Sequence, residues 1–400
     1  MIKIALLGYG TIGSGVAEVL KINQESIAKR AGEEIEVKYV LDKRDFPGDP
    51  IQAKVVHDYD VIVSDPEVQV VVEAMGGVEP AYTFVKGALL AGKSVTTSNK
   101  ALVAKHGAEL LAIAKEKNVH FLFEASVGGG IPIIRPLNSS LTADEVEEIT
   151  GILNGTTNYM LTKMTFEGLE FHDVLKDAQA RGYAEADPTA DIEGQDACRK
   201  IAILTSLVCG QQVEFEDIYT EGITQISPAD IQYAKAMNRV IKLLATSRKA
   251  GNSYCAMVCP MLLPPEHPLY SVNDVFNGIF VHGNVLGDAM FYGSGAGKLP
   301  TASAVVADIV DIVKNQGRNI MTAWSSAKLP LLDHKLAVNR FFLRTSESSE
   351  RILELFKNAE LIKVPGILGE TGVLTEAMTE EDYEEKAAKL SNVIQMIRVA

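Results

Sequence analysis

The stretch that decides the fold class is Gly8-Tyr9-Gly10-Thr11-Ile12-Gly13, a G-x-G-x-x-G pattern near the start of the chain. It follows an apolar, strand-like stretch, residues 3–7, and it opens a predicted helix. In that context Gly8 permits the tight turn, Gly10 lets a pyrophosphate approach the backbone, and Gly13 lets the helix pack on the strand. The N–H groups and the dipole of the helix would face the negative charge. The motif therefore predicts a dinucleotide site at Gly8, Gly10, Thr11, Ile12 and Gly13.

Strand-like and helix-like stretches alternate outward from this motif as far as about residue 124. The predicted strands are residues 3–7, 35–41, 61–64, 68–74, 94–97 and 120–124. The predicted helices are residues 16–29, 80–91 and 107–118. Strands that alternate with helices indicate a parallel sheet covered by helices. We therefore expect an α/β fold that begins with a Rossmann dinucleotide-binding domain over residues 1–130.

The second predicted strand ends in Asp42-Lys43-Arg44, where a Rossmann domain recognises the ribose of its cofactor. An acidic residue at this point binds the ribose 2′-hydroxyl of NAD, whereas basic residues hold the 2′-phosphate of NADP. Asp42 favours the first cofactor, and Lys43 and Arg44 favour the second. The preference between NADP and NAD therefore stays open, and a solvated strand end is a further alternative.

Composition limits the class of protein. The chain has 400 residues, enough for two or three domains of roughly 100–200 residues each. Its formal net charge of −14 argues against nucleic acid as a partner, because phosphate binding needs clustered basic residues. The sequence has neither an apolar run of the roughly 18 residues that a membrane helix needs nor a secretion signal. With only four cysteines, a disulfide framework is not expected. We expect a cytoplasmic protein with no membrane or nucleic-acid partner.

The rest of the chain has a different pattern. Longer helices are predicted among strands after residue 130; the helices are residues 158–166, 171–180, 193–209 and 228–245, and the strands are 146–153 and 254–263. This pattern indicates a second, mixed α/β domain over residues 131–300. The apolar helix 301–316, within the segment 301–325, is expected to complete the first sheet. The tail, residues 335–400, has the order βαββαβ, with strands 337–344, 361–364, 372–377 and 392–399 and helices 349–358 and 379–390.

Asp196 and Lys200 are four residues apart on a predicted helix, so their side chains share one face. That face continues with Ile203 and Leu207, which an ordinary solvated surface would not carry. Burying two charges is costly unless they have partners or a chemical task. A structural salt bridge is the alternative to a role in catalysis.

Further motifs identify a family. They are Thr97-Ser98-Asn99-Lys100, Gly155-Thr156-Thr157-Asn158, the stretch Gly182-Tyr183-Ala184-Glu185-Ala186-Asp187-Pro188 running on to Asp196 and Lys200, and Gly295-Ala296-Gly297-Lys298. With the glycine motif, this set resembles the homoserine dehydrogenase family over about residues 1–325. The resemblance implies an NAD(P)-dependent oxidoreductase that interconverts homoserine and aspartate 4-semialdehyde. It also implies that residues 131–300 bind substrate and dimerise, in a homodimer or homotetramer.

The resemblance implies roles for particular residues. Lys200 would give a proton to the aldehyde oxygen, while Glu185 and Asp196 hold the substrate. Lys100 would lie where nicotinamide and substrate meet, and the cofactor would be lined by Gly182 and Gly297. These residue types suit the chemistry, because hydride attack on an aldehyde builds negative charge on oxygen, which an ammonium stabilises and then protonates. Lysine, with an ordinary pKa of about 10.4, carries that proton at neutral pH.

The same resemblance implies a sodium ion in the stretch Glu124-Ala125-Ser126-Val127-Gly128-Gly129-Gly130-Ile131. Glu124 would supply its carboxylate, and Val127, Gly129 and Ile131 would supply backbone carbonyl groups. Carbonyl ligands leave no side-chain pattern in a sequence, so the residues alone do not indicate an ion.

Two other functions remain as alternatives. A catalytically inactive nucleotide sensor would not need the intact Lys200, Asp196 and Glu185. A dehydrogenase for another amino-acid aldehyde is the second alternative, and the phosphorylating kind would need a cysteine nucleophile such as Cys198 with a base beside it. No such base is evident in the sequence.

The βαββαβ tail resembles an ACT domain, a small module that binds amino acids. The first strand of such a module usually ends in a Pro-Gly turn, but here the chain reads Arg344-Thr345-Ser346-Glu347-Ser348-Ser349. Pro365-Gly366 comes later, away from that position. We therefore expect the module to lack its usual ligand loop and threonine to have little effect on activity. A tail that only stabilises the fold or the assembly is the corresponding interpretation.

Overall fold

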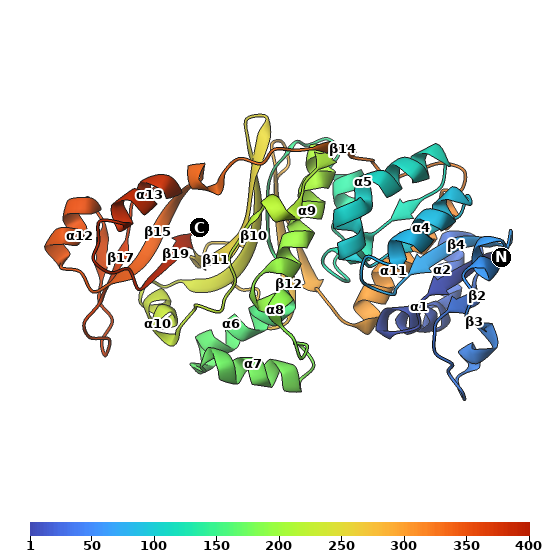
Figure 1. Cartoon of the computed structure of the whole chain (residues 1–400), viewed down its shortest axis with the longest axis horizontal. Helices are drawn as coiled ribbons and strands as arrows, with labels where there is room; N and C mark the ends of the chain where they lie inside the picture. Colours follow the sequence, from blue (N-terminus) through green and yellow to red (C-terminus); the bar gives the residue numbers. More distant parts are fainter. The chain divides into compact units, whose positions relative to one another are not determined.

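The computed structural model describes all residues, 1–400, in two compact units (Figure 1). The first unit comprises residues Met1–Glu145, Ala202–Phe215 and Gly293–Leu329. The second comprises Val146–Ile201, Glu216–Tyr292 and Pro330–Ala400. Each unit is therefore assembled from segments that are far apart in the sequence. No helix in the chain combines the length and the apolar character needed to cross a membrane.

The first unit is built on a six-stranded parallel sheet with the order β3-β2-β1-β4-β5-β6. Its strands are β1 (Ile2–Leu7), β2 (Ile35–Leu41), β3 (Val55–Val56), β4 (Val68–Glu73), β5 (Ser94–Thr97) and β6 (Phe121–Leu122). This is the strand order of a Rossmann fold, in which the ligand binds where the order reverses, beyond the carboxyl ends of the strands. The predicted α/β class and Rossmann sheet are confirmed.

Helices cover the first sheet on both sides. They are α1 (Thr11–Ile22), α2 (Gln24–Ala31), α3 (Asp60–Val63), α4 (Ala81–Leu90), α5 (Lys100–Glu116) and α11 (Lys298–Lys314). Although α11 comes late in the chain, its apolar side packs in one core with α1 and the first strands; that core includes Ile4, Val16, Val72, Val305 and Ile309. A short two-stranded sheet, β8 (Gln211–Gln212) with β14 (Ser325–Lys328), also belongs to this unit.

Four local predictions in this unit were wrong in whole or in part. The helix expected over residues 16–29 is two helices that break at Asn23, where ψ is +22°. The strand expected at 61–64 is the helix α3. The helix expected at 107–118 begins at Lys100, because the Asn99 side chain caps it by accepting from the Leu102 N–H. The strand expected at 120–124 is confirmed only as the two-residue strand β6, after which Glu124–Ser126 form a single helical turn.

The second unit contains one large sheet with the strand order β13-β12-β7-β10-β11-β19-β15-β17-β16. Its first strands are β7 (Val146–Ile152), β9 (Tyr219–Thr220), β10 (Val240–Ala250), β11 (Ser253–Leu263), β12 (Phe276–Gly283) and β13 (Gly287–Ser294). Its helices are α6 (Gly155–Glu167), α7 (Phe171–Ala180), α8 (Thr189–Ile192) and α10 (Pro228–Ala236), together with the first part of α9 (Gln195–Cys209), whose residues from Ala202 onward belong to the first unit. The helix predicted at 228–245 was wrong beyond residue 236, because Asn238 adopts a positive φ of 53° and the apolar stretch after it pairs as β10.

The tail has the predicted βαββαβ order with one addition, the two-residue strand β18 before its second helix. Its elements are β15 (Val338–Thr345), α12 (Ser349–Leu355), β16 (Glu360–Ile362), β17 (Thr371–Leu374), β18 (Met378–Thr379), α13 (Glu380–Ala387) and β19 (Gln395–Val399). The strand order β19-β15-β17-β16 is ferredoxin-like, and the tail has its own apolar core around Phe341 and Tyr383. Because β19 also pairs with β11, the tail extends the large sheet. Its kinship with ACT domains, like the three-part domain division, stays a prediction.

Single turns of 3-10 or π helix complete the chain. They are η1 (Pro50–Lys54), η2 (Glu124–Ser126), η3 (Pro136–Ser140), η4 (Phe215–Asp217) and η5 (His334–Leu336).

Candidate active site

The glycine motif lies between β1 and α1, at the carboxyl edge of the sheet. Gly8 has φ +96°, and a Cβ built on Gly13 would lie 2.0 Å from the Gly8 carbonyl oxygen, so only glycine fits there. A Cβ on Gly10 would meet nothing within 4 Å. No side chain caps α1, which leaves the N–H groups at Thr11 and Ile12 available. The turn thus has open space in front of uncommitted backbone donors, as an anionic ligand requires.

A pocket of about 570 Å³ extends from this turn to the end of β2. Gly8, Gly10, Asp42, Lys43 and Arg44 line it, together with residues of the loop after β4. The Arg44 guanidinium donates to both Asp42 carboxylate oxygens at 3.0 Å, and Asp42 also accepts from the Tyr9 N–H at 2.9 Å. The pKa of Asp42 is therefore held well below its usual range, chiefly by Arg44. Lys43 is exposed. Both of the basic residues predicted here, Lys43 and Arg44, line the pocket.

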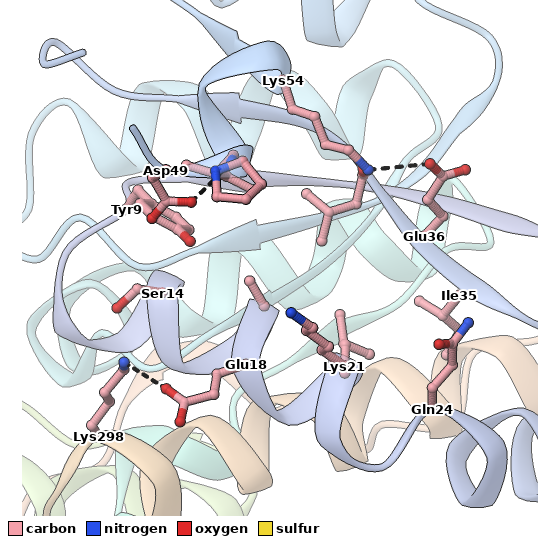
Figure 2. Close-up of a pocket in the computed structure, with 15 residues that line it drawn as sticks. Tyr9, Ser14, Glu18, Lys21, Gln24, Ile35, Glu36, Asp49, Lys54 and Lys298 are labelled. Carbon is pink, nitrogen blue, oxygen red and sulfur yellow. Dashed lines mark hydrogen bonds and ion pairs between the residues drawn. The ribbon is translucent and has the colours of Figure 1, made fainter. Parts of the chain in front are cut away.

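A second pocket, of about 560 Å³, lies beside α1, β2 and η1 (Figure 2). Two of its three lysines have acidic partners: Lys298 donates to Glu18 at 2.7 Å, and Lys54 donates to Glu36 at 3.1 Å, whereas Lys21 forms no ion pair. This pocket includes neither Gly10 nor Asp42, so the pocket that joins the glycine turn to the end of β2 is the better candidate for the ribose end of the cofactor.

Lys100 begins α5, directly after β5 and the Asn99 cap. The neighbouring Glu73 ends β4 and is completely buried, although it has no basic partner. Its carboxylate accepts from the Thr97 hydroxyl at 2.5 Å and from the Met75 N–H at 2.7 Å. Burial raises the pKa of Glu73. This carboxylate ties together the loops that follow β4 and β5, and so orders the chain that leads into Lys100.

Sequence reasoning missed Glu73 because it ends a run of valines that was interpreted only as a strand. The signal was a lone acidic residue at the carboxyl end of a buried parallel strand, where ligands bind. The predicted cofactor glycine Gly297 is the residue before α11 and has φ +115°. Gly182, in the second unit, follows α7 and has φ +74°.

The acid–lysine pair lies at the start of α9 in the second unit. The Lys200 ammonium donates to Asp196 Oδ2 at 2.7 Å and to the Leu153 carbonyl at 2.6 Å. Both residues are buried, with 9% of Lys200 and 4% of Asp196 exposed. An ammonium has three N–H donors, so one donor of Lys200 remains for a ligand.

Asn154 holds this pair from the end of β7. Its amide donates to Asp196 at 2.9 Å and to Asp191 at 2.8 Å, while its carbonyl oxygen caps α6 by accepting from the Thr157 N–H at 2.9 Å. Sequence reasoning missed Asn154, which directly precedes the Gly155-Thr156-Thr157-Asn158 motif. An asparagine just before a predicted helix is a typical N-cap, and that was the available signal.

Two other predicted groups lie apart from the pair. Glu185 is exposed between α7 and α8, and no hydrogen bond joins its carboxylate to Asp196 or Lys200. The Asn158 amide donates to the carbonyls of Val272, Asp274 and Phe276, so its role is to hold that loop.

The Glu124 carboxylate accepts from the N–H groups of Ile133, Ile134 and Arg135 at 2.6–2.9 Å. Burial raises the pKa of Glu124. Burial, together with the neighbouring Glu124 carboxylate, raises the pKa of Asp308 to about 7. The chain has no cluster of three or more histidine, cysteine or acidic side chains placed to bind a metal. Any cation in the loop after Glu124 would therefore depend on carbonyl groups.

The cysteines argue against a thiol nucleophile. None of the four forms a disulfide, and burial raises the pKa of Cys198, the one on the Asp196 helix. A raised pKa leaves less of the reactive thiolate at neutral pH.

The Rossmann sheet, the uncapped glycine turn and the buried acid–lysine pair together define a dinucleotide-dependent dehydrogenase. Over 382 residues the chain is 45% identical to homoserine dehydrogenase from Synechocystis sp., an alignment that covers 93% of this chain and 86% of that protein. Residues 8–124 match the family model for the homoserine dehydrogenase NAD binding domain, and residues 132–310 match the family model for homoserine dehydrogenase. The chain belongs to the homoserine dehydrogenase family.

Other proteins agree with this assignment. The chain is 39% identical to homoserine dehydrogenase from Pseudomonas aeruginosa, covering 100% of this chain and 92% of that one. A crystal structure of a homoserine dehydrogenase from Thiobacillus denitrificans superposes with a TM-score of 0.91 at 37% identity, covering 100% of this chain and 98% of that one. A hyperthermophilic archaeal homoserine dehydrogenase in complex with NADPH matches with a TM-score of 0.67 at 28% identity, covering 78% and 97%.

The protein is thus an NAD(P)-dependent oxidoreductase that interconverts L-homoserine and L-aspartate 4-semialdehyde, a reaction of threonine and methionine biosynthesis.

Proposed function

We propose that Lys200 is the group that protonates the aldehyde oxygen of aspartate 4-semialdehyde during reduction. The observation that carries this proposal is its ammonium, which is buried, fixed by Asp196 and Leu153, and left with one donor for a ligand. When bound, the nicotinamide supplies the hydride. As negative charge grows on the substrate oxygen, the Lys200 ammonium stabilises it and then transfers a proton to it. In the oxidation of homoserine, the neutral amine would take that proton back.

Asp196 has two tasks in this proposal. Its Oδ2 atom keeps the Lys200 ammonium in place by accepting a hydrogen bond from it. With Glu185, it would also hold the α-ammonium group of the substrate. Because Glu185 is exposed and belongs to a segment between two helices, its contact with substrate would form only when substrate binds. Lys100, at the head of α5, is proposed to contact the nicotinamide and substrate.

The glycine turn is proposed to bind the pyrophosphate of the cofactor through the N–H groups at Thr11 and Ile12. Gly10 leaves room for the phosphate, while Gly182 and Gly297 are proposed to border the cofactor. Asp42, Lys43 and Arg44 would select between the riboses of NAD and NADP.

A sodium ion is proposed for the loop after Glu124. The carbonyl groups of Val127, Gly129 and Ile131 accept no backbone hydrogen bond, and their residues are buried, so a cation would satisfy them. The Glu124 carboxylate is already engaged by three N–H groups, so its contribution would be mainly its charge. The ion would order this loop, and its effect is measurable as a rise in unfolding temperature in sodium chloride relative to tetramethylammonium chloride.

A homodimer or homotetramer is proposed as the assembly, supported by the exposed apolar side chains Phe276, Met290 and Tyr292 on β12 and on the edge strand β13. Sedimentation velocity would measure it. A cytoplasmic location stays a prediction of the sequence.

The test of the residue assignment is a steady-state assay that follows NAD(P)H absorbance with aspartate 4-semialdehyde. Wild-type protein should consume the reduced cofactor, and the Lys200→Ala variant should bind cofactor normally yet turn over poorly. Normal turnover in that variant would remove Lys200 from the mechanism.

A further inference from the structure

We propose that Arg398 and Glu221 are positioning residues for the reaction, which act on Asp196 and Lys200 through the loop of residues 192–194. The proposal rests on the function assigned above to the acid–lysine pair. It makes the last strand of the tail a part of the machinery that aligns the active site.

Arg398, on β19, is completely buried yet charged. Its guanidinium forms a two-pronged ion pair with Glu380 in the tail and donates to Glu221 Oε2 at 2.8 Å. The guanidinium also lies 4.9 Å from the centre of the Tyr219 ring. A buried arginine with partners on both sides is costly to release, because removing a single partner leaves a desolvated charge. Arg398 therefore joins the tail firmly to the segment that contains Tyr219 and Glu221.

That segment is held rigidly against the large sheet. Its strand β9 pairs with β11, and the Glu221 N–H donates to the Val258 carbonyl at 2.8 Å. With its backbone paired and its side chain bound to Arg398, Glu221 has little freedom to move alone. A displacement of β19 would therefore be passed on to the residues that follow Glu221.

Gly222 and Ile223, which follow Glu221, pack closely against the loop before α9. The Ile223 N–H donates to the Ile192 carbonyl at 2.8 Å. A Cβ built on Gly222 would lie 2.2 Å from the Ile192 carbonyl oxygen and 2.5 Å from Glu193 Cα. There is thus no room for even a methyl group between the two segments, and closely packed contacts transmit small shifts.

The loop leads directly into α9, the helix that contains Asp196 and Lys200. Gly194 has φ +79°, and its carbonyl accepts the first helical hydrogen bond of α9, from the Cys198 N–H at 2.9 Å. Asp196 follows two residues later, and Lys200 one turn further. A shift of the loop would therefore move the Lys200 ammonium, and a displacement of about 1 Å at reacting groups can cost up to roughly 100-fold in rate.

The molecule contains a natural control for this pathway. Arg344, on β15, is a second buried arginine of the tail, and it pairs with Glu370 at 2.9 Å and with Asp230 at 2.8 Å. Asp230 belongs to α10. No hydrogen bond or ion pair joins these residues to the loop 192–194, so this ion pair should matter to stability and not to catalysis.

The experiment compares three variants in the full-length protein. Glu221→Gln weakens the link while keeping its shape, Gly222→Ala pushes on Ile192 directly, and Glu370→Gln is the matched control. Turnover, KM for homoserine, cofactor affinity and unfolding temperature are measured for each. We expect kcat to fall about tenfold in the first two, with KM and cofactor affinity within about twofold of wild type. Glu370→Gln should lower only the unfolding temperature.

A loss of kcat that follows the unfolding temperature equally in all three variants would overturn the proposal, as would normal kcat in both Glu221→Gln and Gly222→Ala. Lys200→Ala separates this failure from a failure of the residue assignment. If Lys200→Ala is inactive while Glu221→Gln and Gly222→Ala are normal, Lys200 keeps its role and only the link to the tail is wrong.

Discussion

The groups proposed to bind the cofactor and those proposed to bind the substrate, here called the cofactor half and the substrate half, are built by opposite means. In the first unit, ligand recognition is assigned mainly to backbone: a glycine turn, an uncapped helix and open space above Gly10. In the second unit, it is assigned to buried side chains that hold one another, with Asn154, Asp196 and Lys200 as the central group. Backbone sites need small residues and room, whereas side-chain sites need partners that fix each rotamer.

This difference teaches where each half is vulnerable. In the cofactor half, a substitution cannot remove the backbone N–H donors. It can only fill the space in front of them, so it should change the affinity for the cofactor. In the substrate half, a substitution removes a side chain that reacts or that orients a reacting group, so it should change turnover. Substitutions in the two halves should therefore differ in whether affinity or turnover changes.

Replacing Lys200 by alanine should lower kcat by about 100-fold or more, the usual contribution of a positioned acid. Cofactor affinity should barely change, because the cofactor half is in the other unit. Steady-state kinetics and a fluorescence titration with NADPH measure the two quantities. Lys163→Ala is the matched control, since Lys163 forms a similar i,i+4 pair with Glu167 nearer the surface. An equal loss of kcat in both variants would show a general structural effect.

Replacing Gly10 by alanine should weaken cofactor binding by about tenfold or more, corresponding to about 1.4 kcal/mol per factor of ten. The added methyl group would enter space that is empty in the free protein, so the unfolding temperature should not change. Gly13→Ala should instead destabilise the fold, because its Cβ would lie 2.0 Å from the Gly8 carbonyl oxygen. If Gly10→Ala binds NADPH as wild type does, the glycine turn has been wrongly assigned to cofactor binding.

Replacing Lys43 and Arg44 together by alanine should weaken NADP by about tenfold while affecting NAD much less. A 2′-phosphate needs positive partners, and the released Asp42 would then favour a ribose hydroxyl. The measurement is kcat/KM for each cofactor at saturating homoserine. Equal losses with both cofactors would mean that these two residues face solvent.

Replacing Glu185 by glutamine should raise KM for homoserine about fivefold, with a smaller fall in kcat, because an exposed ion pair is worth up to about 1 kcal/mol. Steady-state kinetics with varied homoserine measure both constants. Glu170→Gln, another exposed carboxylate of the same unit, is the control and should leave KM unchanged. A wild-type KM in Glu185→Gln would exclude this residue from substrate binding.

The smallest expected effect is that of threonine, which at millimolar concentration should leave activity unchanged. In the tail, the loop after β15 is closed from within, because the Glu347 carboxylate accepts from the Ser391 N–H at 3.0 Å and its hydroxyl at 2.7 Å. A ligand carboxylate would meet both this negative charge and occupied donors. Isothermal titration and steady-state assays check the prediction. Saturable inhibition that disappears when the tail is removed would refute it.

The sequence by itself determined the fold class and the family. Both depend on local patterns. The glycine motif Gly8 to Gly13 after an apolar strand can be recognised from consecutive residues alone, and so can the i,i+4 spacing of Asp196 and Lys200. The βαββαβ order of the tail was also readable, because each of its elements has its own periodicity. Errors came where local patterns were ambiguous, as at residues 237–245, where an apolar stretch suits a helix or a buried strand equally well.

Only the tertiary structure decided which side chains meet. In the sequence, Glu73 is only an acidic residue after a run of valines. The structure shows that its carboxylate accepts hydrogen bonds from Thr97 and from the loop after β4. Likewise, nothing in the sequence links Arg398, near the last residue, to Glu221. The physical reason is that a hydrogen bond or a buried ion pair depends on distance in space, which is set by how β9, β11 and β19 pair. Strand pairing is a property of the whole sheet, and no local stretch of the chain contains it.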